Sequence, residues 1–268
     1  KIIHARFALD DGKAAVDGEL VIPGVSGTGA PVRLEFREPG GATTGKLLPT
    51  GNVVDTLDVP GVGKIRASLI DAANATCFLN AADLGLTGIE MPEALDASTE
   101  LLEKLSKIRI AASIAMGIGK DAASAARNRT VPFVSFVSRP QDAPSLSGET
   151  IRADSVDLTG RAISNGQPHR ALPLTVTLCM AVAARIEGSI VNQVARLNSS
   201  PDAEIRIAMP SGVLVVAASV QQVNGVWRAE QGGFYRTQRR LFDGYVYVRA
   251  SRVPGLVAGS KGKVKAAA

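Results

Sequence analysis

Few side chains in this 268-residue chain are of the types that commonly perform chemistry. The sequence has two cysteines, Cys77 and Cys179, and two histidines, of which His169 stands shortly before the apolar run 172–186. No Cys-x-x-Cys or His-x-x-x-His spacing occurs, so the sequence predicts no metal site. We interpret both cysteines as packing residues, because a thiol becomes a nucleophile only where a cation or a helix N-terminus lowers its pKa.

His169 stands just before the point where a helix is expected to begin. The first N–H groups of a helix lack internal partners and carry partial positive charge, so the position suits a carboxylate. An imidazole there can donate a hydrogen bond to the same anion. A capping or surface imidazole explains the residue equally well, and the residue types alone leave both roles open.

Short polar motifs supply the other candidates. "PTGN" offers a hydroxyl and an amide beside a glycine that admits a ligand to the backbone, and "MPSG" offers a hydroxyl beside a glycine between two strands. "GTGAP" at 27–31 resembles a phosphate-binding loop loosely, because no Lys-Ser/Thr follows it. Local sequence favours a plain turn or loop for all three. The residues of the first two motifs are Thr50, Gly51, Asn52, Ser211 and Gly212.

Charge and apolar content exclude several function classes. The net charge is +5, from 30 basic and 25 acidic residues, and aromatic residues make up only 4%. Lysines and arginines are not clustered with aromatics between them, so we expect no nucleic-acid partner; small anionic molecules fit the charge better. The longest apolar run, 172–184, is too short for a membrane span of about 20 residues. We therefore expect a soluble, cytoplasmic protein.

Periodicity predicts an α+β fold in which a curled sheet surrounds one buried helix. Apolar residues at helical spacing predict an amphipathic helix over 98–115, and the run 172–186 is apolar nearly all round, as in a helix enclosed by protein. Strands are expected in consecutive pairs rather than alternating with helices, which argues against a doubly wound fold. The segment 37–52, rich in Gly, Pro and Thr, is the best candidate for a crossing between two domains.

Several stretches together resemble the PrpF family. They include "LLPTGNVVDTLDVPGVGKIRASLIDAANATCFLNAADLGLTGIE", "DSVDLTGRAISNGQPHRALPLTVTLCMAVAARIEGS", "MPSGVLVV" and "FYRTQRRLFDGYVYV". The resemblance implies a diaminopimelate-epimerase-like fold of two similar domains, each a curled sheet around a central hydrophobic helix, with the site in the cleft between them. The expected division is 1–44 for the remainder of the first domain, 45–225 for the second, 226–250 for a return segment and 251–268 for a disordered tail.

The resemblance also implies an activity. The family includes 2-methylaconitate cis–trans isomerase, 4-oxalomesaconate tautomerase and 3-methylitaconate isomerase, which act by proton transfer on unsaturated di- or tricarboxylates without a cofactor. A base removes a proton beside a carboxylate, and the allylic anion is reprotonated elsewhere. Two alternatives are a catalytically inactive carboxylate-binding protein and an amino-acid epimerase, which would need two opposed cysteines. The residues carried over as substrate-binding are Thr50, Gly51, Asn52, Met116, Gly117, His169, Ser211 and Gly212.

The sequence departs from the family at its N-terminus. Family members carry an Arg-Gly-Gly-Thr-Ser-Lys type motif, a catalytic Lys, and a catalytic Cys in Gly-Asn-Cys-Gly-Asn; the chain has neither motif and starts inside a strand-like pattern without Met. We expect that a preceding segment holds the proton-transfer pair and that the present chain alone is inactive. The particular substrate and the oligomeric state stay open, a homodimer included.

Overall fold

The structure is a computed structural model that describes residues 2–198, 200, 203–238, 242, 244–247 and 249. Residues Lys1–Gln238 form one compact unit and Arg239–Ala268 a second. In the second unit the described residues lie in neither helix nor strand. The tail expected at 251–268 lies outside the described residues.

All described helices and strands belong to the first unit. The strands are β1 (Ile2–Phe7), β2 (Leu9–Asp10), β3 (Lys13–Ala14), β4 (Leu20–Val21), β5 (Thr28–Arg37), β6 (Asp55–Val59), β7 (Gly63–Ala72), β8 (Asn74–Asn80), β9 (Phe133–Ser138), β10 (Ala143–Pro144), β11 (Thr150–Ile151), β12 (Leu158–Ser164), β13 (Gln167–Pro168), β14 (Ile205–Met209), β15 (Gly212–Val223) and β16 (Val226–Gln238). The α-helices are α1 (Pro92–Ala97), α2 (Thr99–Ala115), α3 (Ala122–Arg127), α4 (Leu174–Arg185) and α5 (Ile190–Val194), and the short 3₁₀ helices span Ala81–Leu84 and Ala153–Ser155.

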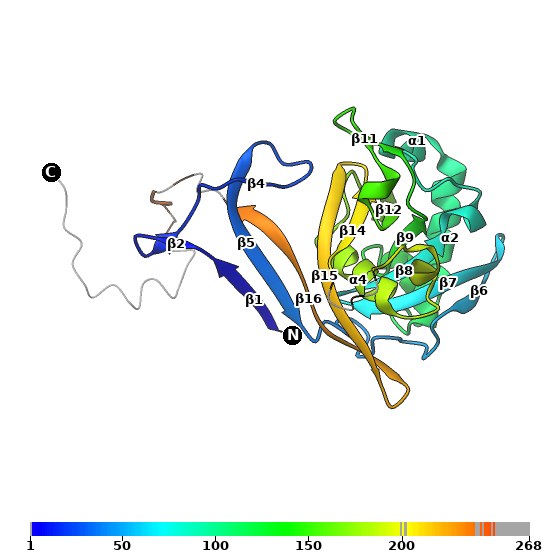
Figure 1. Ribbon diagram of the computed structural model, residues 1–268. Helices are drawn as coiled ribbons and strands as arrows, with labels where there is room; N and C mark the ends of the chain where they lie inside the picture. The colour runs from blue at the N-terminus through cyan, green and yellow to red at the C-terminus, as the bar shows by residue number, and fades with distance from the viewer. Residues whose placement is uncertain are drawn as a thin grey trace. The chain divides into compact units, whose positions relative to one another are not determined.

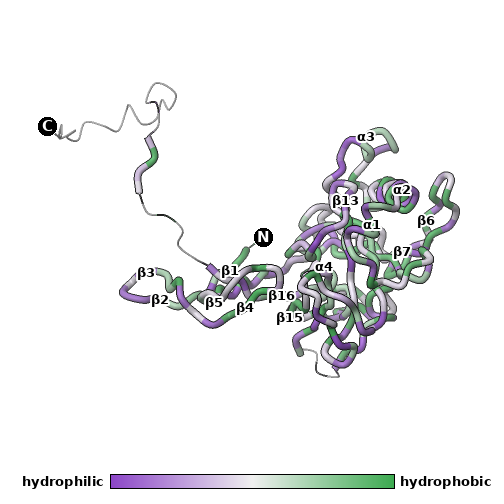
Figure 2. The backbone as a smooth tube through the Cα atoms, turned by 90° about the horizontal axis from the view of Figure 1, so that it is seen from above, coloured by the Kyte–Doolittle hydropathy of each residue, from purple (hydrophilic) through white to green (hydrophobic). Residues whose placement is uncertain are grey.

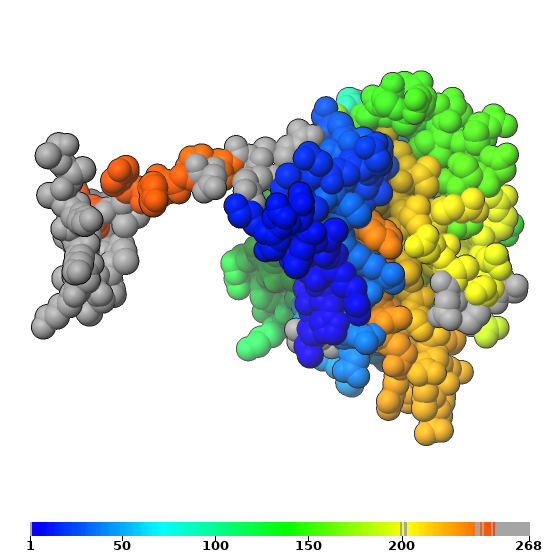
Figure 3. All heavy atoms as spheres, turned by 60° about the vertical axis from the view of Figure 1, so that its left-hand side comes forward, coloured from blue at the N-terminus to red at the C-terminus, as the bar shows by residue number. Residues whose placement is uncertain are grey.

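One twelve-stranded mixed sheet organises the first unit (Figure 1). Its strand order is β1-β5-β16-β15-β14-β12-β9-β8-β7-β6, with β4 paired to β5 and β13 paired to β12. Most neighbours are antiparallel, but β8–β9 and β12–β14 are parallel. Because β5 pairs with both β1 and β16, the first strands of the chain and the last one lie side by side. Figure 3 shows these N-terminal strands, in blue, against the orange residues of β16.

Helix α4 lies among the strands and is enclosed nearly all round (Figure 2). Every residue from Val176 to Ala184 is buried, because β7, β8, β15, β16 and α5 all pack against the helix. This confirms the prediction of an enclosed helix over 172–186, with its first turn starting slightly later, at Leu174. A helix with apolar side chains on every face is stable only in such a position.

A second core lies on the opposite face of β7 and β8. Alternate residues of β8 divide between the two cores: Phe78 faces α4, whereas Cys77 and Leu79 pack with α2. Burial on both faces explains why these strands are continuous apolar runs rather than alternating patterns. Helix α2 confirms the helix expected over 98–115 and covers this face with Leu105 and Ile108.

The α+β fold expected from the sequence is confirmed, as are the consecutive strand pairs β7–β8 and β14–β15. One local expectation was wrong: "GTGAP" is not a free loop, because β5 already begins at Thr28. Thr28 and Gly29 pair with β4, and the next two residues, Ala30 and Pro31, pair with β16, so the ladders occupy this stretch of backbone. The proposed division into domains stays a prediction.

Candidate active-site cavity

A cavity of about 480 Å³ lies beside the beginning of α4. Five segments that are distant in sequence line it: the loop after β4, the connection between β10 and β11, the segment between β13 and α4, the turn between β14 and β15, and the end of β16. Its lining residues are Ile22, Pro23, Gly24, Val25, Leu146, Arg170, Ala171, Leu172, Met209, Ser211, Arg236 and Thr237. Two arginines are among them and no acidic residue is, so the described lining is positively charged.

The Ser211–Gly212 turn joins β14 to β15 and forms one wall of the cavity. Gly212 has φ of 135°, and a Cβ at this position would lie 2.8 Å from Cβ of Pro23. Only glycine therefore lets the loop after β4 pack onto the turn. The Ser211 Oγ atom is buried and has no hydrogen-bond partner among the described residues. A buried hydroxyl of this kind has unused capacity to bind a polar ligand.

Arg236 enters the cavity from the end of β16. Its position is fixed by strand alternation: Phe234 and Arg236 point to the same side of the sheet, and the guanidinium lies 5.4 Å from the centroid of the buried Phe234 ring. Burial lowers the pKa of Arg236 from its ordinary value, but a guanidinium remains protonated in proteins. The side chain therefore brings a positive charge to a largely apolar wall.

Arg170 provides the second positive charge, at the exposed side of the cavity. Its Nη1 atom lies 2.5 Å from Oε1 of Glu93, at the start of α1, so this charge is already paired. Behind it, the Leu172 N–H donates to the Met209 sulfur at 3.2 Å, and Pro173 at the N-cap of α4 makes no side-chain capping bond. The cavity lining of this segment ends at Leu172, and α4 begins at Leu174 without a side-chain cap on its first N–H groups.

His169 directly precedes two residues that line the cavity, although its own side chain is exposed. Its Nδ1 accepts a hydrogen bond from the Ala171 N–H at 3.3 Å, and its backbone N–H donates to the Ala162 carbonyl at 2.8 Å. In the neutral imidazole this leaves Nε2 as the N–H donor. The structure thus gives His169 a local backbone contact, and its role in carboxylate recognition stays a prediction.

The "PTGN" residues do not line this cavity, and two of them hydrogen-bond to Asp55. Thr50 Oγ1 donates to Asp55 Oδ2 at 2.8 Å, and Asn52 Nδ2 donates to Asp55 Oδ1 at 2.8 Å. Gly51 has φ of 84°, the left-handed conformation that such a turn requires. These contacts hold the turn before β6, so the described structure does not bring Thr50, Gly51 and Asn52 together with the Ser211 turn. Their role in substrate binding stays a prediction.

Met116 and Gly117 terminate α2. The Met116 side chain is buried in the second core, and Gly117 has φ of 72°. The Gly117 N–H donates to the Ile114 carbonyl and the Ile118 N–H to Ser113, so the two residues form a glycine C-terminal cap. Neither residue lines the cavity beside α4, and their predicted contact with substrate remains untested.

Both cysteines are confirmed as packing residues. Cys77 and Cys179 are buried, and burial raises the pKa of each thiol to about 12. A thiol with such a pKa is not a thiolate near neutral pH and cannot act as the base or nucleophile. Within the described parts of the chain, no group of three or more His, Cys, Asp or Glu side chains is arranged to hold a metal ion.

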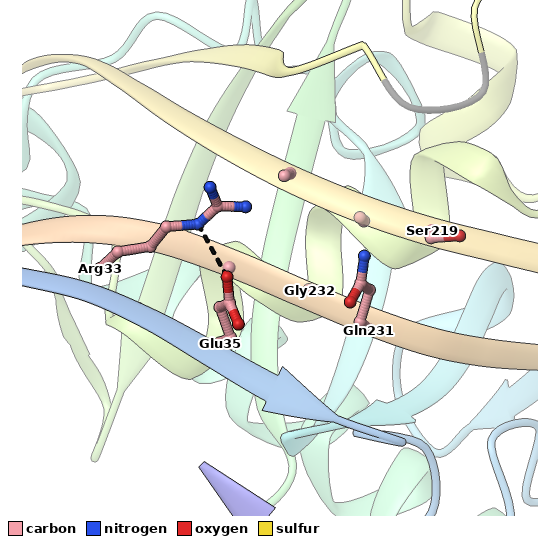
Figure 4. A pocket seen from close by; sticks show the side chains of 8 residues that line it. Arg33, Glu35, Ser219, Gln231 and Gly232 are labelled. Atoms are coloured by element: carbon pink, nitrogen blue, oxygen red, sulfur yellow. Dashed lines mark ion pairs between the residues drawn. The ribbon is translucent and has the colours of Figure 1, made fainter. Parts of the chain in front are cut away.

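A second cavity, of about 270 Å³, lies on the opposite face of the sheet, across β5, β15 and β16 (Figure 4). Arg33 and Glu35 point toward each other there, with Nε and Oε1 3.1 Å apart. Arg6 contacts the same carboxylate at 3.1 Å, and its hydrogen bond lowers the pKa of Glu35. Because these charges are already paired, this cavity is less suited to an anion than the one beside α4.

Sequence reasoning missed Arg236 and Arg170. Arg170 stands next to His169 in the quoted motif, but its place beside a cavity depends on the fold. Arg236 had a usable signal in "GGFYRTQ", where strand alternation puts an arginine on the same face as an inward phenylalanine. An arginine at an inward position of a strand needs an explanation, since buried charges are usually paired.

Comparisons with known proteins place the chain in a family. The family model described as PrpF protein matches residues 1–249. The chain is 38% identical to 3-methylitaconate isomerase of Eubacterium barkeri over 94% of its own length and 66% of the relative's. It is 36% identical to 2-methyl-aconitate isomerase of Shewanella oneidensis, over 92% and 63% of the two chains. A crystal structure of methylitaconate-delta-isomerase matches with a TM-score of 0.84 at 37% identity, covering 98% of this chain and 66% of that one.

The chain thus spans about two thirds of the length of the curated relatives that it matches. The solved isomerase structure shares its fold across nearly all of the present chain. In the part of the chain that the structure describes, no helix is both long and apolar enough to cross a membrane.

Proposed function

The chain belongs to the PrpF family, and on that premise we propose that the protein containing it is an isomerase of unsaturated di- or tricarboxylates. The relatives named as 3-methylitaconate isomerase and 2-methyl-aconitate isomerase support this substrate class. The observation that carries the proposal is the cavity beside α4, which is lined by two arginines, a free hydroxyl and apolar side chains, with no acidic residue among its described lining.

The proposed reaction moves a proton and a double bond. A base removes a proton from a carbon next to a carboxylate, the electron pair spreads over the double bond and the carboxylate, and a proton returns to the far carbon. Positive groups that hold the carboxylate stabilise the negative charge that develops, which is usually a large contribution to catalysis. In this scheme the cavity of the present chain binds the substrate and stabilises the anion.

The proton-transfer groups are assigned elsewhere. Apart from the two arginines, no described residue lining the cavity has a titratable side chain, and both cysteines are buried. A base must titrate near the operating pH, which an arginine does not. We therefore propose that a lysine and a cysteine outside this lining transfer the proton, as the family resemblance implies, without a cofactor.

The test uses the full-length protein with 3-methylitaconate and 2-methylaconitate in D₂O, without added metal, followed by proton NMR. The expected result is migration of the double bond or deuterium incorporation next to a carboxylate. If neither change occurred with any substrate of this class, the isomerase assignment would be refuted. Calorimetric binding of the same acids without exchange would instead identify a carboxylate-binding protein.

A further inference from the structure

Arg236 lacks the protein acceptors that the buried arginines Arg161 and Arg109 have. Arg161, which is 1% exposed, donates to the Glu90 and Gly160 carbonyls, and Arg109 donates to the Asn128 and Ala125 carbonyls. Arg236 is half-buried, and among the described residues its guanidinium makes no hydrogen bond or ion pair. It makes a cation–π contact with the ring of Phe234.

These donors are available to a ligand. A guanidinium has five N–H donors, and those of Arg236 have no protein acceptor among the described residues, so an anion in the cavity can accept from them. The Ser211 Oγ atom, in the lining of the same cavity, is buried and also without a partner. Two polar groups with unused donors thus line one cavity: Ser211 at the turn between β14 and β15, and Arg236 near the end of β16.

We propose that Arg236 and Ser211 form the subsite for one carboxylate of the substrate, and that the apolar wall formed by Ile22, Leu172 and Met209 takes the carbon skeleton. This inference rests on the proposed function, because it names the groups that anchor the substrate of that reaction. A carboxylate accepts two parallel N–H bonds from a guanidinium, which fixes its orientation as well as its position.

Arg170 is the weaker candidate for this anchor. Its side chain is 64% exposed and its charge is paired with Glu93, which is 58% exposed. An exposed pair of this kind contributes little energy and keeps water at both groups. A half-buried guanidinium without a protein partner gains more from a new charge-assisted hydrogen bond than an exposed, already neutralised one.

The experiment measures the affinity of the full-length protein for 3-methylitaconate and its two monomethyl esters by calorimetry. Arg236→Met keeps an unbranched apolar side chain and removes the charge; we expect the diacid to bind about 10- to 100-fold more weakly. In the wild type one monoester should bind that much more weakly than the diacid. In Arg236→Met the same monoester and the diacid should bind alike, because the carboxylate that the ester blocks has lost its partner.

Arg33→Met is the matched control. Arg33 faces Tyr235 across the β5–β16 ladder, 5.9 Å from its ring centroid, but on the opposite face of the sheet. Its loss should leave the Kd of the diacid unchanged. Arg236→Lys, which keeps the charge but not the planar fork, should fall between wild type and Arg236→Met, and Ser211→Ala should weaken binding by about 3- to 10-fold.

Wild-type affinity for the diacid in an Arg236→Met protein with an unchanged thermal unfolding midpoint would overturn the subsite. If Arg236→Met does not fold, the Arg236→Lys and Ser211→Ala proteins decide: wild-type affinity in both refutes the proposal. The outcome is separable from the proposed function, because binding is measured without turnover. Loss of binding in a protein that never isomerises would refute the reaction and keep the subsite.

Discussion

Gly232 of β16 allows α4 to pack directly against the sheet. A Cβ at this position would overlap Cδ1 of Leu178 and lie 3.3 Å from its Cγ and 3.2 Å from the Ala217 carbonyl oxygen. Leu178 is fully buried within the enclosed helix, so it has no free space to move into. We therefore predict that Gly232→Ala lowers the free energy of unfolding by about 1–3 kcal/mol, the usual cost of overpacking a core.

A double-mutant cycle isolates the cause. Leu178→Ala alone should cost about 2–5 kcal/mol, as truncations of buried leucines do. In the combined Gly232→Ala/Leu178→Ala protein the new methyl group occupies space that the leucine vacates. The loss in the double variant should therefore be smaller than the sum of the two single losses by at least about 1 kcal/mol.

Urea unfolding followed by circular dichroism gives the four free energies. Gly160→Ala is the matched control, because Gly160 of β12 also faces α4, but its Cβ would meet the flexible end of Met180, at 2.7 Å from Cε and 2.9 Å from Sδ. A thioether adapts more easily than a branched leucine, so this loss should be smaller. Additive losses in the cycle, or a larger loss for Gly160→Ala, would refute the packing argument.

Three further predictions concern other groups. Because burial raises the folded-state pKa of Cys77 and Cys179 to about 12, stability should be complete below the unfolded thiol pKa of about 8.5 and fall as pH rises toward 12; urea midpoints from pH 7 to 10 should fall less in a protein with both cysteines changed to alanine. His169→Ala in the full-length protein should raise KM for the dicarboxylate with an unchanged unfolding midpoint, and unaltered kinetics would assign the residue to its local backbone contact. Asp71→Asn should cost about 1–3 kcal/mol in urea unfolding, because Asp71 Oδ2 accepts from the Thr44 N–H at 2.6 Å and the Thr44 hydroxyl at 2.9 Å; a smaller loss than in Thr44→Val would contradict this.

Local patterns were sufficient for the helices α2 and α4. The all-round apolar run at 172–186 could only be a helix inside protein, and α4 is one. The stripe over 98–115 gave α2 because Leu105 and Ile108 lie on one helical face. "GTGAP" was misread as a loop, since its glycines suggest a turn while the pairing of Gly29 with β4 depends on residues outside the motif.

The sequence indicated where the Ser211 turn lies, but not its contact with substrate, which stays a prediction. The turn borders the cavity because a hydroxyl and a glycine between two strands lie at a hairpin end. Thr50 and Asn52 have side chains that could bind a ligand, but Asp55, five and three residues further along the chain, accepts their hydrogen bonds. Residue type shows what a side chain can bind, but not whether a neighbour already satisfies it.

The sequence by itself determined that 98–115 and 172–186 form helices, that the second of them is enclosed by protein, and that the two cysteines pack in the core. Those properties follow from side-chain volume and hydropathy at short spacing, which are local. Only the tertiary structure decided that Arg236 meets the Ser211 turn and the loop after β4 in one cavity, while Arg170 is paired with Glu93. The reason is physical: whether a charged group keeps an unused hydrogen-bonding capacity depends on which strands and helices become its neighbours, and that is set by contacts between residues far apart in the chain.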